Sequence, residues 1–280
     1  MRTLGLCTVQ DLGRRGHMHE AVPPGGALVP ELLVAANRRV GNRDDAPALE
    51  VLGRLVVRAA SDVHIATHRE SCELRPGGEH VVESAPLRAA YLAVRGGFDV
   101  PVRLGGRGTL LCARLGRPLA RGDVLRVGTE ARGVGGVGDH GTSRESDRFV
   151  GSDDVAVIPG PDLDAFESDA IEELVRATYR ISPTSDRVGT RLEDLGAPSA
   201  GSRASSRNSS GLRCVEGYRE RSRPMVIGAL EVPRDGQPIV LGPEHPTTGG
   251  YPVIAVIASA ELGRFFAIPL GGTVRFRVAR

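Results

Sequence analysis

Short runs of Val, Ile and Leu, separated by glycine and proline, recur along most of this 280-residue chain. Such runs between turn residues are typical of strands in β-sandwiches and barrels. The clearest predicted strands are residues 49–58, 63–67, 89–95, 124–127, 155–159, 239–241, 253–258 and 273–278. In the last of these, apolar and charged residues alternate, which predicts a strand with one exposed face. The pattern as a whole predicts a mainly β fold.

Three segments have helical character instead, at residues 31–40, 163–178 and 259–267. The first has Pro30 where a first helical residue belongs and Gly41 just past its end. The second places its apolar residues on one stripe, and the third begins at Ser259 and stops before Pro269. We expect all three to be packing helices.

Residues 131–154 are rich in glycine, serine and charge, and they predict a linker because they can bury little apolar surface. This linker would divide the chain into two β-rich parts, residues 1–130 and residues 155–280. A second polar stretch, residues 196–223, lacks periodicity and predicts a long loop over the second part.

The charges are nearly balanced, with 36 basic and 34 acidic residues, so no strong field attracts a polyanion and we expect no nucleic-acid binding. Every basic residue is arginine, and the chain has no lysine. A Walker A loop, a Schiff base and a biotin carrier each need that amine. Any phosphate or carboxylate must therefore be bound by arginine or by backbone N–H groups.

Cysteine and histidine give no strong metal pattern. The four cysteines lie far apart without a CxxC pair, and the pair His64 and His68 falls on a predicted strand, so we expect no metal site. No run of about 18 apolar residues is present, and the first residues lack the apolar region of a secretory signal. We therefore expect a cytoplasmic protein without a membrane contact.

Acidic and basic residues stand beside glycine turns at two places. Asp11 and Arg14 lie between two such turns, which indicates either exposed N–H groups beside a cation or a structural turn with a surface ion pair. Asp186 precedes Arg187, and it would either orient Arg187 toward an anion or form a surface pair with it. Glu50, in an apolar strand, is either a base or a solvent-facing edge residue.

The most specific segment is residues 238–252, where a predicted strand runs into an acid, two hydroxyls and a glycine pair before another strand begins. One interpretation is an oxyanion cradle, with an acid or base and an aromatic donor or stacking face beside it. The other is a plain strand, turn and strand. The residues concerned are Glu244, Thr247, Thr248, Gly249, Gly250 and Tyr251.

Taken in order, several blocks of the chain resemble one family, known as the C subunit of 5-oxoprolinase, allophanate hydrolase subunit 2 (KipA) or the biotin-dependent carboxyltransferase A/B domain. The blocks are TVQDLGR, ALE, YLAVRGG, RPLARGDVL, SDRVGTRL, GALEVPRDGQPIVL, TTGGYP and GGTVRF. They span nearly the whole chain. The resemblance implies two cyclophilin-like β-barrel subdomains with a few short helices.

The resemblance also implies a function. Members act with a KipI-like B subunit and an A subunit of 5-oxoprolinase to open the cyclic amide 5-oxoproline to glutamate. The reaction uses ATP and magnesium, bound either here or with the partner subunit. One alternative is carboxyl transfer to urea or a related amide from biotin carried on another protein. Another is a non-catalytic, KipA-like regulatory binding protein.

The resemblance also implies site roles for particular residues of this chain. As catalytic groups we expect Glu244, acting as acid or base, together with Arg187 and Tyr251. The expected substrate or anion site comprises Asp11, Arg14, Thr247, Thr248, Gly249 and Gly250. The chain also departs from the family pattern, most clearly at Glu231, where the family has the glutamine of GAIQVP, and at Glu244, where it has an aspartate. These changes favour a divergent member with an altered substrate or without catalysis.

Overall fold

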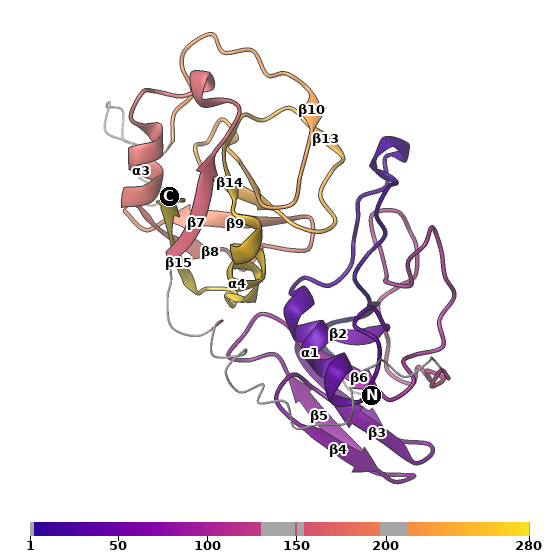
Figure 1. The fold of residues 1–280 in the computed structure, drawn as a ribbon. Helices are drawn as coiled ribbons and strands as arrows, with labels where there is room; N and C mark the ends of the chain where they lie inside the picture. Colours follow the sequence, from indigo (N-terminus) through magenta and orange to yellow (C-terminus); the bar gives the residue numbers. More distant parts are fainter. Residues whose placement is uncertain (1–2, 130–148, 150–153, 197–211, 280) are drawn as a thin grey trace. The chain divides into compact units, whose positions relative to one another are not determined.

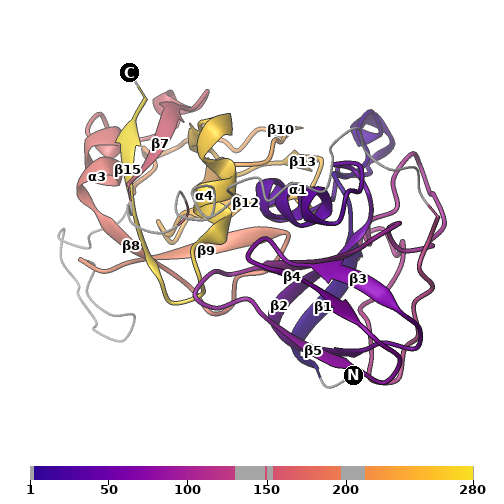
Figure 2. The same ribbon diagram turned by 60° about the horizontal axis from the view of Figure 1, so that its bottom comes forward.

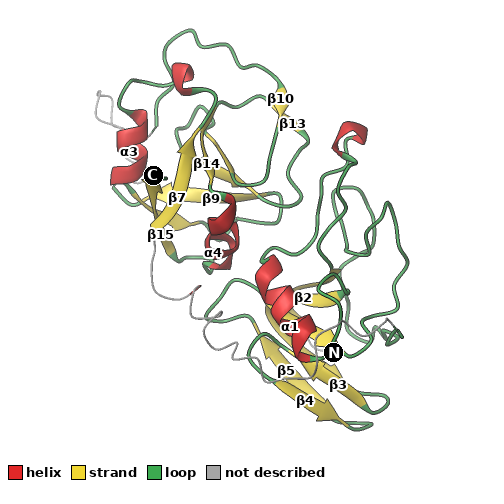
Figure 3. Cartoon of the chain, viewed as in Figure 1, coloured by secondary structure: helices red, strands yellow, loops and turns green. Residues whose placement is uncertain are grey.

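The computed structural model describes residues 3–129, 149, 154–196 and 212–279. The chain forms two compact units, Met1–Gly151 and Ser152–Arg280 (Figure 1). The expected linker, residues 131–154, lies outside the described residues apart from Phe149 and Asp154, and Asp154 begins a strand. Strands and loops dominate both units (Figure 3), so the predicted mainly β class is confirmed.

The first unit is built on a six-stranded antiparallel sheet with the order β1-β2-β6-β3-β4, in which β5 also pairs with β2. Strand β2 is long enough to pair with three other strands. Residues 48–55 pair with β1, residues 49–51 with β6 and residues 54–58 with β5. The strands are β1 (Thr3–Gln10), β2 (Ala48–Arg58), β3 (Val63–Ala66), β4 (Ser71–Leu74), β5 (Glu79–Glu83) and β6 (Ala90–Val94).

Helix α1 (Pro30–Arg39) lies over this sheet (Figure 2). It begins with the expected proline, packs against β6 and buries Leu32, Leu33 and Ala36. A short 3₁₀ helix, η1 (Met18–Glu20), precedes it. The helix that the sequence predicts at residues 31–40 is therefore confirmed to within one residue at each end.

The second unit is a closed barrel with the strand order β11-β12-β9-β8-β15-β7-β14. Its strands are β7 (Asp154–Pro159), β8 (Thr178–Ile181), β9 (Gly189–Asp194), β11 (Ala229–Glu231), β12 (Ile239–Leu241), β14 (Val253–Ile257) and β15 (Thr273–Val278). Of the barrel's pairings, only that of β15 with β7 is parallel. A separate two-stranded ribbon joins β10 (Arg223–Pro224) to β13 (Thr248–Gly249).

Aromatic side chains fill the barrel. The ring of Phe276 lies 5.8 Å from that of Tyr179 and 6.3 Å from that of Phe265, measured between centroids. Along β15, Val274 and Phe276 are buried while Arg275 is exposed, which confirms the predicted alternation. The third predicted helix is present as η4 (Ser259–Glu261) followed by α4 (Leu262–Ala267).

The helix predicted at residues 163–178 is wrong as one element. It divides into η3 (Leu163–Ala165) and α3 (Ala170–Arg176), and Thr178 already belongs to β8. Phe166 is extended and bridges to Cys214, and the N–H of Val215 donates to the carbonyl of Ala165 at 2.9 Å. This pairing with a distant segment replaces the helical hydrogen bonds that the local pattern favours.

The strand predicted at residues 124–127 is also wrong. Val124 is 83 % exposed, and the segment makes only an isolated bridge between Val127 and Phe98. An apolar run becomes a strand only where a neighbouring strand is available to pair with it. Among the helices that the structure describes, none has the length and apolar character needed to span a bilayer.

Candidate functional site

Residues 247–251, called here the 247–251 turn, connect β12 to β14 in the second unit. Thr248 and Tyr251 are exposed, whereas Thr247 and the two glycines are partly buried. The turn includes β13, in which Thr248 pairs with Pro224 and Gly249 with Arg223. The carbonyl of Thr247 also accepts a hydrogen bond of 3.0 Å from the N–H of Met225. Part of the backbone expected to cradle an oxyanion is therefore engaged in a ribbon.

Asp162 connects this ribbon to strand β14 of the barrel. Its carboxylate forms an ion pair with Arg223 on β10, and its Oδ2 accepts a hydrogen bond of 2.9 Å from the N–H of Val253, where β14 begins. Asp162 is itself buried. The sequence pattern gives this residue no role beyond its place before a predicted helix, because its two partners lie far away in the chain.

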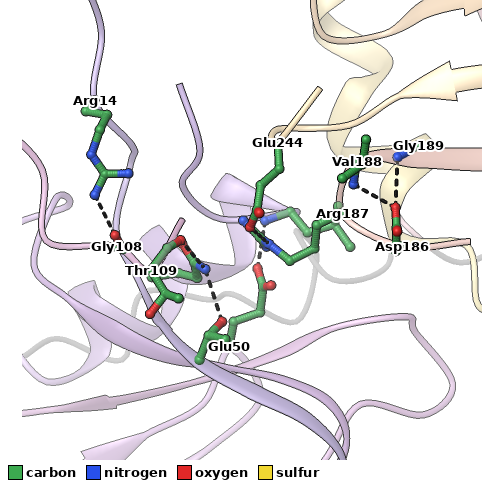
Figure 4. A network of polar contacts seen from close by, with 12 residues as sticks. Arg14, Glu50, Gly108, Thr109, Asp186, Arg187, Val188, Gly189 and Glu244 are labelled. Atoms are coloured by element: carbon green, nitrogen blue, oxygen red, sulfur yellow. Dashed lines mark hydrogen bonds and ion pairs between the residues drawn. The ribbon is translucent and has the colours of Figure 1, made fainter. Parts of the chain in front are cut away.

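Arg187 and Glu244 form a buried ion pair at the base of the turn. The Nε of Arg187 donates to Oε1 of Glu244 at 2.7 Å, and each side chain is at most 3 % exposed (Figure 4). Backbone hydrogen bonds support the pair, since the N–H of Glu244 donates to the carbonyl of Arg187 and that of Gly242 to Val188. The pair joins the start of the turn segment to the loop before β9.

Asp186 contacts the backbone that directly follows it. Its Oδ1 accepts hydrogen bonds from the N–H groups of Val188 at 2.8 Å and Gly189 at 3.0 Å, which is the local turn that aspartate commonly forms (Figure 4). The carboxylate that meets Arg187 comes from Glu244, which lies 57 residues further along the chain.

Glu231, at the end of β11, is a second buried acid beside the turn. A β-bulge separates Leu230 from Glu231, and Glu231 is 8 % exposed. Burial raises the pKa of its carboxyl to about 7. A Cβ placed on Gly249 would lie 2.7 Å from Oε1 of Glu231, so the carboxyl occupies the space that a side chain at position 249 would need.

His245 is also buried next to the turn. Burial lowers the pKa of its imidazole, although the hydrogen bond to Pro246 acts in the opposite direction. Its Nδ1 lies 2.7 Å from the carbonyl oxygen of Pro246, and only a protonated Nδ1 can donate to that acceptor. The neutral ring therefore acts as a hydrogen-bond donor within the segment that leads into the turn.

Asp11 and Arg14 lie in the first unit, and both are buried. Oδ1 of Asp11 accepts a hydrogen bond from the N–H of Gly13 at 2.8 Å, and its Oδ2 accepts one from the N–H of Arg107 at 2.5 Å. The guanidinium of Arg14 donates to the carbonyl of Gly108 (Figure 4). Both side chains thus organise backbone near residues 103–108, and because both are buried, the expected surface ion pair is wrong.

Glu50 is 1 % exposed, so the interpretation of a solvent-facing edge residue is wrong. Its Oε2 accepts hydrogen bonds of 2.7 Å from the N–H of Leu28 and from the hydroxyl of Tyr91. The Tyr91 oxygen in turn accepts one from the N–H of Val29 at 2.9 Å. This network ties the segment before α1 to the sheet.

The structure therefore brings Arg187, Glu244 and the 247–251 turn together in the second unit, while Asp11 and Arg14 belong to the first. Sequence reasoning assigns no site role to Asp162, Arg223 or Glu231. Within the described ranges, no group of three or more His, Cys, Asp or Glu residues is placed to hold a metal ion.

Comparison with known proteins yields a family model and several relatives. Residues 85–278 match the model described as the carboxyltransferase domain, subdomain A and B. The C subunit of 5-oxoprolinase from Escherichia coli is 31 % identical, over 96 % of this chain and 87 % of its own. The urea amidolyase of Lachancea kluyveri is 27 % identical over 96 % of this chain, which corresponds to 16 % of that enzyme.

A solved structure gives the same result for the fold. The crystal structure of TTHA0988 superposes with a TM-score of 0.76 at 25 % identity, covering 97 % of this chain. This chain spans 53 % of the TTHA0988 chain, about half of its length.

Proposed function

Because this chain belongs to the family of carboxyltransferase domains with subdomains A and B, we propose that it is a component of an ATP-dependent 5-oxoprolinase-type amidohydrolase. Such an enzyme opens 5-oxoproline to glutamate, here together with a KipI-like B subunit and an A subunit. The similarity to a protein named as the C subunit of 5-oxoprolinase supports this choice. The structural observation that carries it is the 247–251 turn, which presents two exposed hydroxyls above a buried ion pair.

The proposed chemistry follows from the low reactivity of an amide. Transfer of the terminal phosphoryl group of ATP to the lactam oxygen activates the carbonyl carbon. Water then adds to this carbon and the ring C–N bond breaks, with the nitrogen taking up a proton, which leaves an acyl phosphate. A second water hydrolyses the acyl phosphate to glutamate and phosphate, and in each addition negative charge develops on oxygen at the former carbonyl carbon. Hydroxyl and N–H donors aimed at that charge lower the barrier. The hydroxyls of Thr248 and Tyr251 are the exposed donors of the turn. Arg187 and Glu244 act in this proposal as positioning residues, because each charge is directed at the other.

ATP and magnesium fit this chain poorly by itself. The chain has no lysine for a phosphate loop, and its described residues offer no cluster of carboxylates for a metal. Magnesium in such enzymes is commonly held by one or two carboxylates together with the phosphates of the substrate. We therefore assign nucleotide and magnesium binding to the partner subunits.

A second candidate function is carboxyl transfer from biotin to urea or a related amide. The family model, described as a carboxyltransferase domain, and the similarity to a urea amidolyase favour it. Biotin would then be carried by another protein, because this chain has no lysine to bear it.

The test is ATP turnover by this chain assembled with its B-type and A-type subunits, with 5-oxoproline as substrate. Thr248→Ala and Tyr251→Phe remove single donors at exposed positions, where substitution costs little stability. We expect each to lower kcat by about a hundredfold, a loss typical of removing one oxyanion donor. Ser168→Ala, at an exposed position elsewhere in the second unit, is the matched control and should leave turnover unchanged.

Turnover that requires 5-oxoproline and is lost in the turn variants supports the amidohydrolase. Carboxylation of urea by a biotinylated carrier, with no lactam turnover, would replace it by the second candidate. A stable complex without either activity would contradict both and favour a regulatory, KipA-like binding protein.

A further inference from the structure

The carboxyl of Glu231 lacks the compensation that the other buried acids of the second unit have. Asp162 is paired with Arg223, and Glu244 is paired with Arg187. Within the part of the chain that the structure describes, the Glu231 side chain forms no hydrogen bond or ion pair. An ionised carboxylate in such a place loses its hydration without gaining a partner, so the neutral form is favoured.

The two strands that flank β11 bring no charge to Glu231, and the one charged residue of the ribbon is engaged elsewhere. The strands paired with β11 contribute Ile239–Leu241 (β12) and Val253–Ile257 (β14), which contain no ionisable side chain. The ribbon contributes Thr248–Gly249 (β13) and Arg223–Pro224 (β10), and the guanidinium of Arg223 is directed at Asp162. Met225 follows β10 and is 1 % exposed.

Glu231 and Met225 both lie directly under the turn. A Cβ on Gly249 would lie 2.5 Å from the Cε of Met225 and 2.7 Å from Oε1 of Glu231. Glycine at this position therefore lets the two side chains pack against the backbone of β13. The ribbon above them is short, with two residues on each strand and one further hydrogen bond from Met225 to Thr247.

We propose that Glu231 is a positioning residue whose neutral carboxyl holds the 247–251 turn in place and whose ionisation releases it. Ionisation favours a fuller hydration of the Glu231 carboxyl, which is only 8 % exposed, and the side chain gains water when the two-residue ribbon parts or when it swings outward past Gly249. Either movement displaces the turn. The movement itself does not depend on the proposed function, and only the conclusion that it displaces the substrate site rests on that function.

The direct test follows the turn without any substrate. Hydrogen exchange of a peptide containing residues 247–251 is measured for the full chain and for Glu231→Gln, which stays neutral at every pH. At about pH 6, where roughly a tenth of the carboxyl is ionised, the two proteins should differ less than at higher pH. At about pH 8, where roughly nine-tenths is ionised, the wild-type turn should exchange at least about tenfold faster than the variant at the same pH.

Comparing the two proteins at the same pH removes the intrinsic dependence of exchange on hydroxide. Glu172→Gln, at an exposed position of α3, is the control and should behave as wild type. Equal exchange of wild type and Glu231→Gln at about pH 8 would overturn the proposal.

The pH dependence of turnover by the assembled enzyme is a second measurement. If it turns over 5-oxoproline, Glu231→Gln should keep the activity at neutral pH and extend it into the alkaline range, where wild type declines. A variant with an unchanged pH profile would contradict the inference while leaving the proposed function intact. If no turnover is found, the proposed function fails, and the exchange experiment still decides the role of Glu231.

Discussion

Glu231 and Glu244 show how two buried residues of one type acquire different roles from their surroundings. Glu244 meets a guanidinium at 2.7 Å, so its charge is matched inside the protein. Glu231 has no ion-pair partner among the described residues, and burial raises the pKa of its carboxyl to about 7. The two residues are close in sequence, yet Glu244 is suited to fixing the backbone and Glu231 to responding to pH.

This difference predicts a pH-dependent stability that Glu231→Gln removes. Between the ordinary pKa of 4.5 and the folded-state value of about 7, the folded protein binds the proton more tightly than the unfolded chain does. The free energy of unfolding of wild type should therefore fall as pH rises through this window and show no further loss from this group above it. The loss relative to Glu231→Gln should be on the order of 3 kcal/mol.

Denaturant unfolding of both proteins across this range measures the effect. Because other groups titrate in both proteins alike, the quantity to compare is the difference between the two curves. A constant difference from about pH 4 to about pH 8 would show that the carboxyl of Glu231 has its ordinary pKa in the folded state, and it would contradict the prediction.

Sequence reasoning identifies Arg187 and Glu244 as candidates but not as a pair. The pairing depends on the register of β9 with β12, in which Leu241 faces Gly189. Local pattern gives no information on such register, so it offers the nearest acid, Asp186, as a partner of Arg187 and does not reveal Glu244. Glu231 stands out in the sequence only as a departure from a family motif, because its burial comes from strands on both sides.

At the scale of elements, strong local signals predict the structure well and weak ones do not. The helix with Pro30 and Gly41 at its ends forms as expected, since capping and periodicity agree. The helix expected at residues 163–178 is broken by pairing with residues 213–215, which no local pattern reveals. The ribbon of β10 and β13 is too short to leave a signature in the sequence.

The packing under this ribbon predicts different stability effects for substitutions at two adjacent glycines. Gly249→Ala places a methyl group 2.5 Å from Met225 and 2.7 Å from Glu231, so it should destabilise the second unit by about 1–3 kcal/mol. Gly250→Ala meets nothing within 4 Å and should change stability by less than about 0.5 kcal/mol. Denaturant unfolding of the two variants checks this, and equal effects would show that the contacts under Gly249 yield easily.

At the scale of the whole molecule, the composition and the spacing of glycine and proline between apolar runs predict a mainly β chain. They do not predict that the second unit closes into a barrel, because closure is decided by which strand edges meet. Closure here depends on β15, which pairs in parallel with β7 and antiparallel with β8. Its inward residue Phe276 also joins the aromatic cluster of Tyr179 and Phe265.

We therefore expect Phe276→Ala to lower the free energy of unfolding of the second unit by about 3–5 kcal/mol, the cost of a large cavity in a core. Arg275→Ala, its neighbour on the outward face, removes only an exposed ion pair with Asp154 and should cost less than about 1 kcal/mol. Thermal and denaturant unfolding of both variants test the prediction. Similar losses would indicate that the outer ion pair carries more of the closure than its exposure suggests.

The pairing of β15 with β7 also determines when the second unit becomes stable during synthesis. Strand β7 leaves the ribosome early, but one of its edges is completed only by Thr273–Val278, and the same late strand covers an edge of β8. Until then the nascent barrel has two open edges, and contacts so distant in sequence form slowly. A ribosome that pauses shortly before this strand would thus hold an unfinished unit exposed to proteases and to pairing with other chains.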